Sequence, residues 1–292
     1  MNAQFNGPIG GMGWLPDRPD IRDYTKVTHR VDTLLGTSNL LYSVKAAPPV
    51  SVDLRPRCSP IVHQGNLGSC TANAATGVLE YFQIRSSGTY SPASRRFIYK
   101  VTRNFLGLHG DTGAYLRSTM GALALFGVPP EKFWTYEIDR FDDEPPAFCY
   151  AFGSNYQALM YYRLDPPGIS LDDLLTDIKA SLAAGLPTMF GFPVYSSIER
   201  AVGGDIPFPS SSERVLGGHA VVAVGYDDSR TVVNPFDGRI TEGALIIRNS
   251  WGTSWGDGGY GYMPYDYVTE GLADDFWVLL DAENVSVTPF DE

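Results

Sequence analysis

The first half of the chain carries apolar residues at the spacing of helices. From Cys70 to about Arg85 a helix is predicted, because these apolar side chains fall on one helical face: Ala72, Ala75, Val78, Leu79 and Phe82. Gly88 follows and is expected to end this helix. Two more helices are predicted in the same way, one that begins near Ser91 and one over residues 113–125.

The second half changes from helical to strand-like spacing. One clear helix is expected over residues 170–184, where Ser170 and Asp173 form a capping box. Short apolar runs separated by turn residues then predict antiparallel strands at residues 188–194, 220–226, 244–248, 259–263 and 276–280. Residues 203–218 are rich in Gly, Pro and Ser, and we expect them to form a long loop just before His219.

The N-terminal region differs from the body of the chain. It is rich in Gly and Pro, and only residues 31–44 have weak helix-like spacing. We expect either a flexible tail or an extended arm that lies on the body. The expected divisions are an N-terminal segment at 1–48, a body at 49–282 with a helical part at about 60–160 and a β part at about 161–282, and a C-terminal tail at 283–292.

The composition is that of a globular protein with an acidic surface. Hydrophobic residues make up 43% and charged residues 19% of 292 positions, enough for one large domain or two lobes. The formal net charge of −11 argues against nucleic acid or an anionic membrane as a partner, because both bind basic faces. No apolar run approaches the roughly 20 residues of a membrane span.

The cysteines and the N-terminus leave the compartment open. Three cysteines, Cys58, Cys70 and Cys149, are too few for a disulfide framework. We expect Cys58 and Cys149 to be buried free thiols, with a bond between them as the alternative. The first residues lack the basic start and apolar core of a secretory signal, so the protein is expected to be cytoplasmic or exported by another route.

One of these cysteines lies in a setting that suits catalysis. Cys70 begins the first predicted helix, directly after a turn in which Gly65 and Gly68 allow a tight backbone path. A thiol at a helix N-terminus faces unpaired amide N–H groups, which are expected to lower its pKa. A buried structural cysteine is the plainer interpretation of a lone Cys, and the flanking glycines argue against it.

An imidazole and a carboxamide follow in the second half. His219 stands at the head of an apolar run, so we expect its ring at a strand end, projecting into a cleft. Asn249 precedes Ser250 and Trp251, and its amide oxygen can accept a hydrogen bond from the imidazole under the cover of Trp251. A core histidine and a turn asparagine are the alternatives. A thiol, an imidazole and a carboxamide are the groups that attack on an acyl carbon requires.

Gln64 stands six positions before Cys70. Its side-chain amide could donate a hydrogen bond to a developing oxyanion, together with the backbone N–H of Cys70. Taken alone, it would be interpreted as a surface glutamine. His63 is the nearest competitor for the imidazole role, but its side chain is expected to point away from that of Gln64.

No cofactor and no metal are expected. The glycines at positions 256, 258 and 261 match a dinucleotide-binding pattern, but neither the required strand before it nor the helix after it is predicted. No Cys/His spacing favours a metal site.

Together these residues resemble the papain family of cysteine peptidases. The motifs that carry the likeness are Gln64, Gly68-Ser69-Cys70, His219-Ala220-Val221 and Asn249-Ser250-Trp251-Gly252. The resemblance covers most of residues 50–282 and is greatest to compact microbial members. It implies an α+β, papain-like two-lobe fold: a helical left lobe, an antiparallel β-barrel-like right lobe, and the active-site cleft between them.

The resemblance also implies the chemistry. Cys70 would attack the scissile carbonyl as a thiolate, and His219 would protonate the leaving amine. Asn249 would orient His219, while Gln64 would stabilise the oxyanion. The chain is therefore expected to be a cysteine-type endopeptidase that works through a thioester and is made as a zymogen. The residues expected to line the substrate cleft are Gly68, Gly113, Gly218 and Trp251.

Some features depart from the family pattern. Thr71 replaces the aromatic residue that usually follows the nucleophile, and Leu67 replaces a cysteine of a usual disulfide. The long helical prosegment of many relatives is missing. Residues 1–48 are expected to act as a short, differently built prosegment that occupies or flanks the cleft.

Two other functions stay open from the sequence. The same Cys–His chemistry could serve another acyl transfer, such as peptide ligation, deamidation or cleavage of cell-wall peptides. A former peptidase kept as a binding module is the non-enzymatic alternative. The expected partners are polypeptide substrates and the chain's own N-terminal segment, with no nucleic acid and no membrane, and we expect a monomer.

Overall fold

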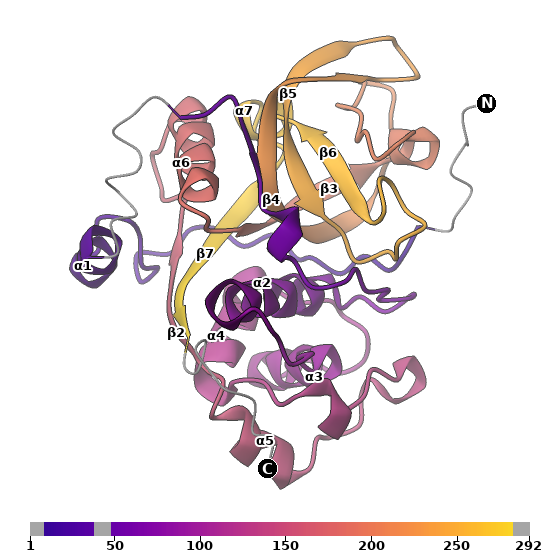
Figure 1. Cartoon of the computed structure of the whole chain (residues 1–292). Coiled ribbons are helices and arrows are strands. Elements are labelled where there is room, and N and C mark those ends of the chain that lie inside the picture. Colours follow the sequence, from indigo (N-terminus) through magenta and orange to yellow (C-terminus); the bar gives the residue numbers. More distant parts are fainter. Residues whose placement is uncertain (1–8, 38–47, 283–292) are drawn as a thin grey trace.

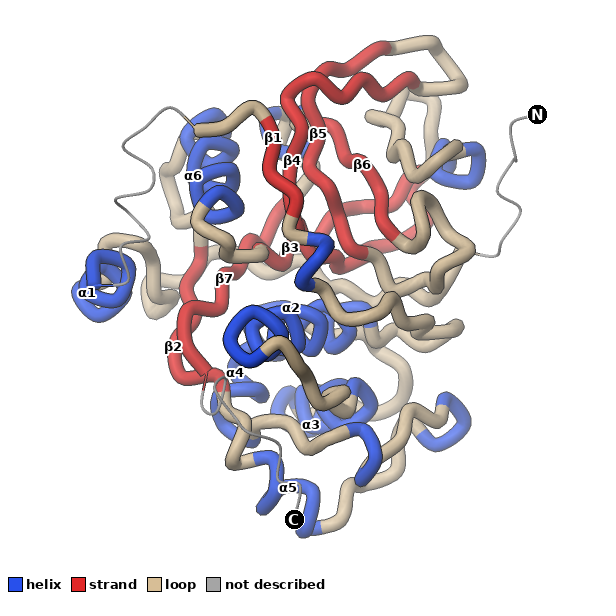
Figure 2. Tube along the Cα trace, in the orientation of Figure 1, coloured by secondary structure: helices blue, strands red, loops and turns tan. Residues whose placement is uncertain are grey.

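The structure is a computed structural model that describes residues 9–37 and 48–282. The α-helices in these ranges are α1 (His29–Thr37), α2 (Cys70–Ser87), α3 (Arg95–Leu106), α4 (Leu116–Phe126), α5 (Ala147–Gly153), α6 (Leu171–Ala183) and α7 (Asp266–Thr269). The strands are β1 (Ser51–Asp53), β2 (Ala158–Arg163), β3 (Thr188–Tyr195), β4 (Val215–Val233), β5 (Ile240–Arg248), β6 (Tyr260–Pro264) and β7 (Asp274–Ala282). Helices α2 to α5 lie together below the sheet in Figures 1 and 2.

The strands form one antiparallel sheet. Its order is β2-β7-β3-β4-β5-β6, and β1 pairs with β4 beside this path. Within the described residues β2 and β6 end the sheet and do not pair with each other, so the expected barrel-like lobe is an open sheet. Helices on one side and an antiparallel sheet on the other confirm the α+β fold class.

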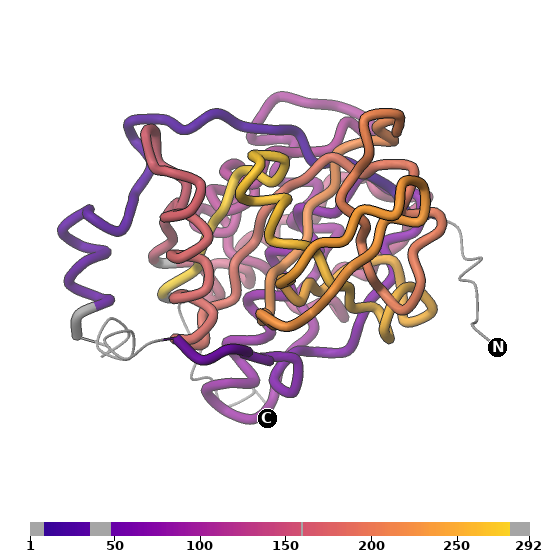
Figure 3. The backbone as a smooth tube through the Cα atoms, turned by 90° about the horizontal axis from the view of Figure 1, so that it is seen from above, coloured from indigo at the N-terminus to yellow at the C-terminus, as the bar shows by residue number. Residues whose placement is uncertain are grey.

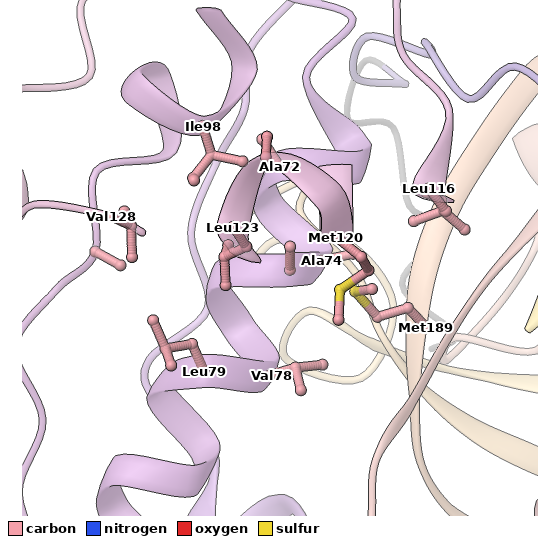
Figure 4. Close-up of a cluster of buried hydrophobic side chains, with 14 of the residues drawn as sticks. Ala72, Ala74, Val78, Leu79, Ile98, Leu116, Met120, Leu123, Val128 and Met189 are labelled. Carbon is pink, nitrogen blue, oxygen red and sulfur yellow. The ribbon is translucent and has the colours of Figure 1, made fainter. Parts of the chain in front are cut away.

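Helix α2 is the centre of the helical part. Most of its residues are buried, because small side chains such as Ala72 and Ala75 allow the neighbouring elements to approach closely. Figure 4 shows its Val78 near Met120 of α4 and Met189 of β3. The helical core is thus continuous with the sheet, which fixes the first turn of α2 against β4.

The local sequence signals for helices are confirmed. α2 ends at Gly88, whose φ of 77° is the left-handed conformation of a glycine cap. Ser170 caps α6 by accepting a hydrogen bond from the Asp173 N–H at 3.1 Å. Ser94 caps α3 in the same way, so that this helix starts after the expected Ser91.

Two predictions about the β part are wrong. β4 begins at Val215, so part of the expected loop over residues 203–218 is strand, and His219 lies inside β4 opposite Phe192 rather than at a strand end. β2 was not predicted at all, and it lies where the helical part was expected to end. Whether each of these two segments forms a strand depends on its pairing with neighbouring strands, and local composition does not contain this information. The boundary near residue 160 stays a prediction.

The N-terminal segment lies on the body. Residues 31–37 of the expected weak helix belong to α1, and the rest of that prediction falls outside the described residues. Before α1, the indigo segment crosses the molecule between the sheet and the helices in Figure 1, and Figure 3 shows it along one edge from above. Arg117 of α4 holds it by ion pairs with Asp17 and Asp23. No helix in residues 9–37 or 48–282 has the length and apolarity to cross a membrane.

Candidate active site

Cys70 is the first residue of α2 and is fully buried. Backbone N–H groups of Ala220, Gly13 and Thr71 face its sulfur. Burial nevertheless raises the pKa of the thiol to about 11, and these donors only reduce the effect. The prediction of a lowered pKa is therefore wrong for the full-length chain. Burial of the helix end raises the thiol pKa by more than the N–H groups of the helix N-terminus lower it.

His219 and Asn249 are in direct contact. His219 Nε2 lies 2.8 Å from Asn249 Oδ1, and the same oxygen accepts the Ser250 N–H at 2.7 Å. The accepting atom is thus the amide oxygen, so Nε2 carries the imidazole proton. Nδ1 is buried and has no hydrogen-bond partner among the described residues. A neutral His219 therefore offers an unprotonated nitrogen, and the structure forms no hydrogen bond between it and Cys70.

Trp251 covers the imidazole. Its ring stacks on that of His219 with centroids 4.5 Å apart and planes at 27°. His219 is fully buried, and this burial lowers its pKa to about 4. The expected cover over the His219–Asn249 hydrogen bond is thus present, and it favours the neutral ring.

Gln64 is held so that its amide hydrogens have fixed directions. Its Oε1 accepts the Ser250 hydroxyl at 2.5 Å, and the other end of the amide faces two backbone oxygens that can only accept, which identifies that end as Nε2. Nε2 donates to the backbone oxygen of Leu67 at 2.8 Å and to that of Gly11 at 2.9 Å. One hydrogen is thus used within the turn before Cys70, and the other is used by the N-terminal segment.

Residues 9–15, here called the covering segment, lie against Cys70, Gln64 and Trp251. Gly11 accepts from Gln64, and the Trp251 indole N–H lies 3.4 Å from the same Gly11 oxygen. The Gly13 N–H faces the Cys70 sulfur. A Cβ atom on Gly13 would overlap the Gly68 backbone oxygen, so the segment can approach this closely only with glycine there.

The four residues expected to line the cleft all lie against the covering segment. Gly218 accepts the Trp14 N–H at 3.1 Å, and Gly113 leaves room for the Gly13 oxygen. Gly68 also faces Gly13, and a Cβ on Gly10 would meet the Trp251 ring. The structure therefore brings together every residue expected at the site, while their catalytic roles stay predictions.

Sequence reasoning missed several residues that hold the site. Asp111 accepts the Gly68 N–H at 2.9 Å, and the Tyr136 hydroxyl donates to the Gln64 backbone oxygen at 2.9 Å. Ser250 connects Gln64 to the neighbourhood of Asn249. Trp14, buried in the covering segment, was signalled only by its glycine-rich surroundings. In the ranges that the structure covers, no cluster of His, Cys, Asp or Glu could hold a metal ion.

A decrease in pH is expected to destabilise the folded full-length chain, because His219 is buried in its neutral form. The unfolded ring binds a proton near pH 6.5 and the buried ring only near pH 4, so the unfolded state holds more protons between these values. Stability should be fully present above pH 6.5 and fall by about 3 kcal/mol toward pH 4. Urea unfolding of the wild type and of His219→Ala measures this. Parallel pH curves for the two proteins would contradict it.

Comparison with known proteins agrees with this geometry. Residues 48–276 match the profile of the family described as papain family cysteine protease. An uncharacterized peptidase C1-like protein of Acanthamoeba polyphaga mimivirus is 32% identical over an alignment of 293 positions, which covers 96% of this chain and 89% of the viral protein. Xylellain, a cysteine protease from Xylella fastidiosa, has a crystal structure with a TM-score of 0.74 at 34% identity, covering 92% of this chain and 96% of xylellain.

A more distant structure supports the fold alone. Procathepsin L 3 of the Tenebrio molitor larval midgut has a TM-score of 0.61 at 19% identity and covers 91% of this chain and 82% of that one. The chain belongs to the papain family of cysteine proteases. It is a cysteine-type endopeptidase, a hydrolase of peptide bonds.

Proposed function

We propose that Cys70, His219, Asn249 and Gln64 carry the endopeptidase reaction, and that the covering segment holds the chain in a latent form. The observation behind this proposal is the use of Gln64: its second amide hydrogen is bound to the Gly11 oxygen, where a reacting carbonyl would need it. A peptide in this position blocks the site and occupies its oxyanion donor at the same time.

The steps of the reaction follow from the positions of the His219 and Gln64 side chains once the covering segment has left the site. The Cys70 proton passes to Nδ1 of His219, the nitrogen that Asn249 leaves free. The thiolate then attacks the scissile carbonyl carbon and forms a C–S bond, and the oxyanion takes the second N–H of Gln64. The C–N bond breaks as His219 protonates the leaving amine. Water, losing its proton to His219, hydrolyses the thioester and restores the thiol.

The direction of the covering segment explains why it can remain uncut. Trp14 pairs with Ala114 in a parallel bridge, in which Ala114 N–H donates to Gly13 and Leu15 N–H donates to Ala114. This pairing turns the Gly13 N–H toward the Cys70 sulfur. A nucleophile attacks a carbonyl carbon, and here the amide N–H, rather than the carbonyl carbon, of the peptide bond is presented to the sulfur.

Contacts outside the cleft also support the interpretation of residues 1–48 as a prosegment. Lys26 forms an ion pair with Asp177 of α6 at 2.5 Å. Val31 and Leu35 of α1 are buried with residues of the body. These contacts keep the covering segment near the cleft, which raises its effective concentration there. The body at residues 49–282 would then be the mature peptidase.

Replacing Gly13 by alanine in the full-length chain is expected to open the site. The new methyl group would clash with the Gly68 backbone, which cannot move as a flexible side chain would. Exposure should return the Cys70 pKa from about 11 toward its ordinary 9, and two pKa units correspond to about 100-fold more thiolate at pH 7. The rate of Cys70 alkylation by iodoacetamide, followed by peptide mass spectrometry, should rise by about this factor.

A matched control separates opening from general damage. Gly121→Ala makes the same change inside α4, where a Cβ meets only ordinary contacts, so its thiol should react as slowly as that of the wild type. A thiol-directed epoxide should label Cys70 in Gly13→Ala and leave Cys58 and Cys149 unlabelled. The proposed function fails if Gly13→Ala neither labels at Cys70 nor hydrolyses any member of a diverse peptide library.

A further inference from the structure

A cavity of about 440 Å³ lies between α2 and the end of β5, and none of the residues assigned to the reaction lines it. Thr76 and Gly77 of α2 form one wall. Residues 60–62, Arg248 of β5 and residues 130–132 contribute to the others. The volume is within the roughly 300–1,000 Å³ of small-molecule sites. We call this cavity the α2–β5 pocket.

The charges of the α2–β5 pocket do not balance. Its lining has three cationic side chains, from Arg95, Lys132 and Arg248, and two acidic ones, from Glu80 and Glu131. Arg95 and Glu131 form an ion pair at 3.0 Å, so these two charges neutralise each other. The remaining lining carries one positive charge in excess, which matches a ligand with a single negative charge.

Two of the cations have no carboxylate partner among the described residues. Arg248 is 6% exposed, and its guanidinium donates to oxygens of Ser59 and Pro60. Lys132 is exposed at the rim. Glu80 accepts the Ser59 hydroxyl instead of forming an ion pair. A buried guanidinium without an anionic partner favours binding of a carboxylate, which it can hold through two N–H groups.

We infer that the α2–β5 pocket binds a small organic monocarboxylate with a compact apolar body, and that this ligand raises the turnover of the peptidase. The carboxylate would supply the missing partner of Arg248 and Lys132. The body would lie against Pro60, Val62 and Tyr90, which give the pocket its apolar surface. Such a carboxylate could be a free small molecule or the last residue of a cleaved peptide.

The walls of the pocket are connected to the residues assigned to the reaction. Arg248 directly precedes Asn249 in β5 and its continuation. Asn73, which lines the opposite wall, donates through Nδ2 to the Ser69 backbone oxygen at 2.9 Å, and Ser69 directly precedes Cys70. A ligand held by both walls would fix the two elements that carry Asn249 and Cys70 relative to each other. The effect on turnover therefore rests on the proposed function, whereas binding does not.

Binding can be measured on the full-length wild type, in which the covering segment closes the catalytic site. N-acetylphenylalanine should raise the Tm and bind in isothermal titration calorimetry. Its amide keeps the body and lacks the charge, so it should bind about 10- to 100-fold more weakly. A hexapeptide with a C-terminal phenylalanine distinguishes the sources: equal affinity indicates peptide ends, and weaker binding indicates a free carboxylate. Equal affinities of acid and amide overturn the inference.

Two pairs of variants place the ligand. Lys132→Glu reverses an exposed charge of the pocket and should weaken binding of N-acetylphenylalanine about 10- to 100-fold, whereas Arg57→Glu reverses an exposed charge elsewhere and should not. Gly77→Ala adds a methyl group 3.1 Å from Arg248 Nε and should also weaken binding, whereas Gly121→Ala in α4 should not. Urea midpoints check that all four variants fold. Unchanged affinity in Lys132→Glu overturns the inference.

The effect on turnover is measured in the Gly13→Ala background. N-acetylphenylalanine should raise kcat for a fluorogenic peptide about 5-fold with little change in KM, and Lys132→Glu should remove this response. Binding without a rise in kcat overturns the effector role. A rise in KM that persists in Lys132→Glu means that the ligand competes in the cleft, which also overturns it. If Gly13→Ala neither cleaves peptides nor is labelled at Cys70, the proposed function fails, while the binding test on the wild type still decides whether the pocket binds carboxylates.

Discussion

His219→Ala is expected to lower kcat/KM by about 10⁴-fold, the upper range for loss of a general acid–base group. Nδ1 of His219 is the buried nitrogen without a partner, and Asn249 fixes the proton on the opposite nitrogen. No other group in the described site is so arranged to take the thiol proton and return it to the leaving amine. The hydrolysis of a fluorogenic peptide by Gly13→Ala chains, with and without His219→Ala, measures the effect.

His63→Ala is the matched control for this prediction. His63 is next to Gln64 in sequence, and its Nδ1 already accepts the Gly65 N–H at 2.8 Å. Its removal should leave turnover nearly unchanged, because that nitrogen is committed to the turn. If His63→Ala lost activity and His219→Ala kept it, the imidazole role would belong to His63.

Gln64→Ala is expected to lower kcat by about 10²- to 10³-fold with little change in KM. The second amide hydrogen of Gln64 is free for an oxyanion only after Gly11 leaves, and an oxyanion forms only along the reaction path. Steady-state kinetics in the Gly13→Ala background measures the two constants separately. A rise in KM at constant kcat would show that Gln64 only binds the substrate.

Gln83→Ala is a matched control for the glutamine. Gln83 is a buried residue of the same helix that follows the site, and its side chain accepts the Ser91 N–H at 3.0 Å. Its loss should reduce stability, seen as an earlier urea midpoint, and leave kcat unchanged. An equal loss of kcat in both variants would mean that the effect of Gln64→Ala is structural.

The features that the sequence predicted correctly are those that local pattern decides. The apolar face of α2 and its glycine cap lie within one short segment, and this local pattern predicted a helix that begins at Cys70 and ends before Gly88. The order of the four candidate catalytic residues along the chain resembled that of a known family. This resemblance predicted that the fold brings them together. The hydrogen bond between His219 and Asn249 joins two strands, β4 and the end of β5, that the apolar runs had indicated.

The features that the sequence did not predict depend on contacts between distant segments. The Trp14 indole N–H donates to Asp275, 261 positions away, so no window of sequence contains both residues. The extent of β4 follows from its partners β3 and β5 rather than from its own residues. The raised pKa of Cys70 has the same origin: the helix end was visible in the sequence, but the segment that covers it was not.

Because Gln64 is used in both states, the latency of the precursor and the turnover of the active enzyme depend on one side chain. The hydrogen that binds Gly11 in the resting chain is the one assigned to the oxyanion during turnover. A substitution of Gln64 should therefore weaken the latency of the precursor and, at the same time, lower the turnover of the activated enzyme. Selection for a safer precursor and for a faster enzyme would then act on the same amide and could not adjust one without the other.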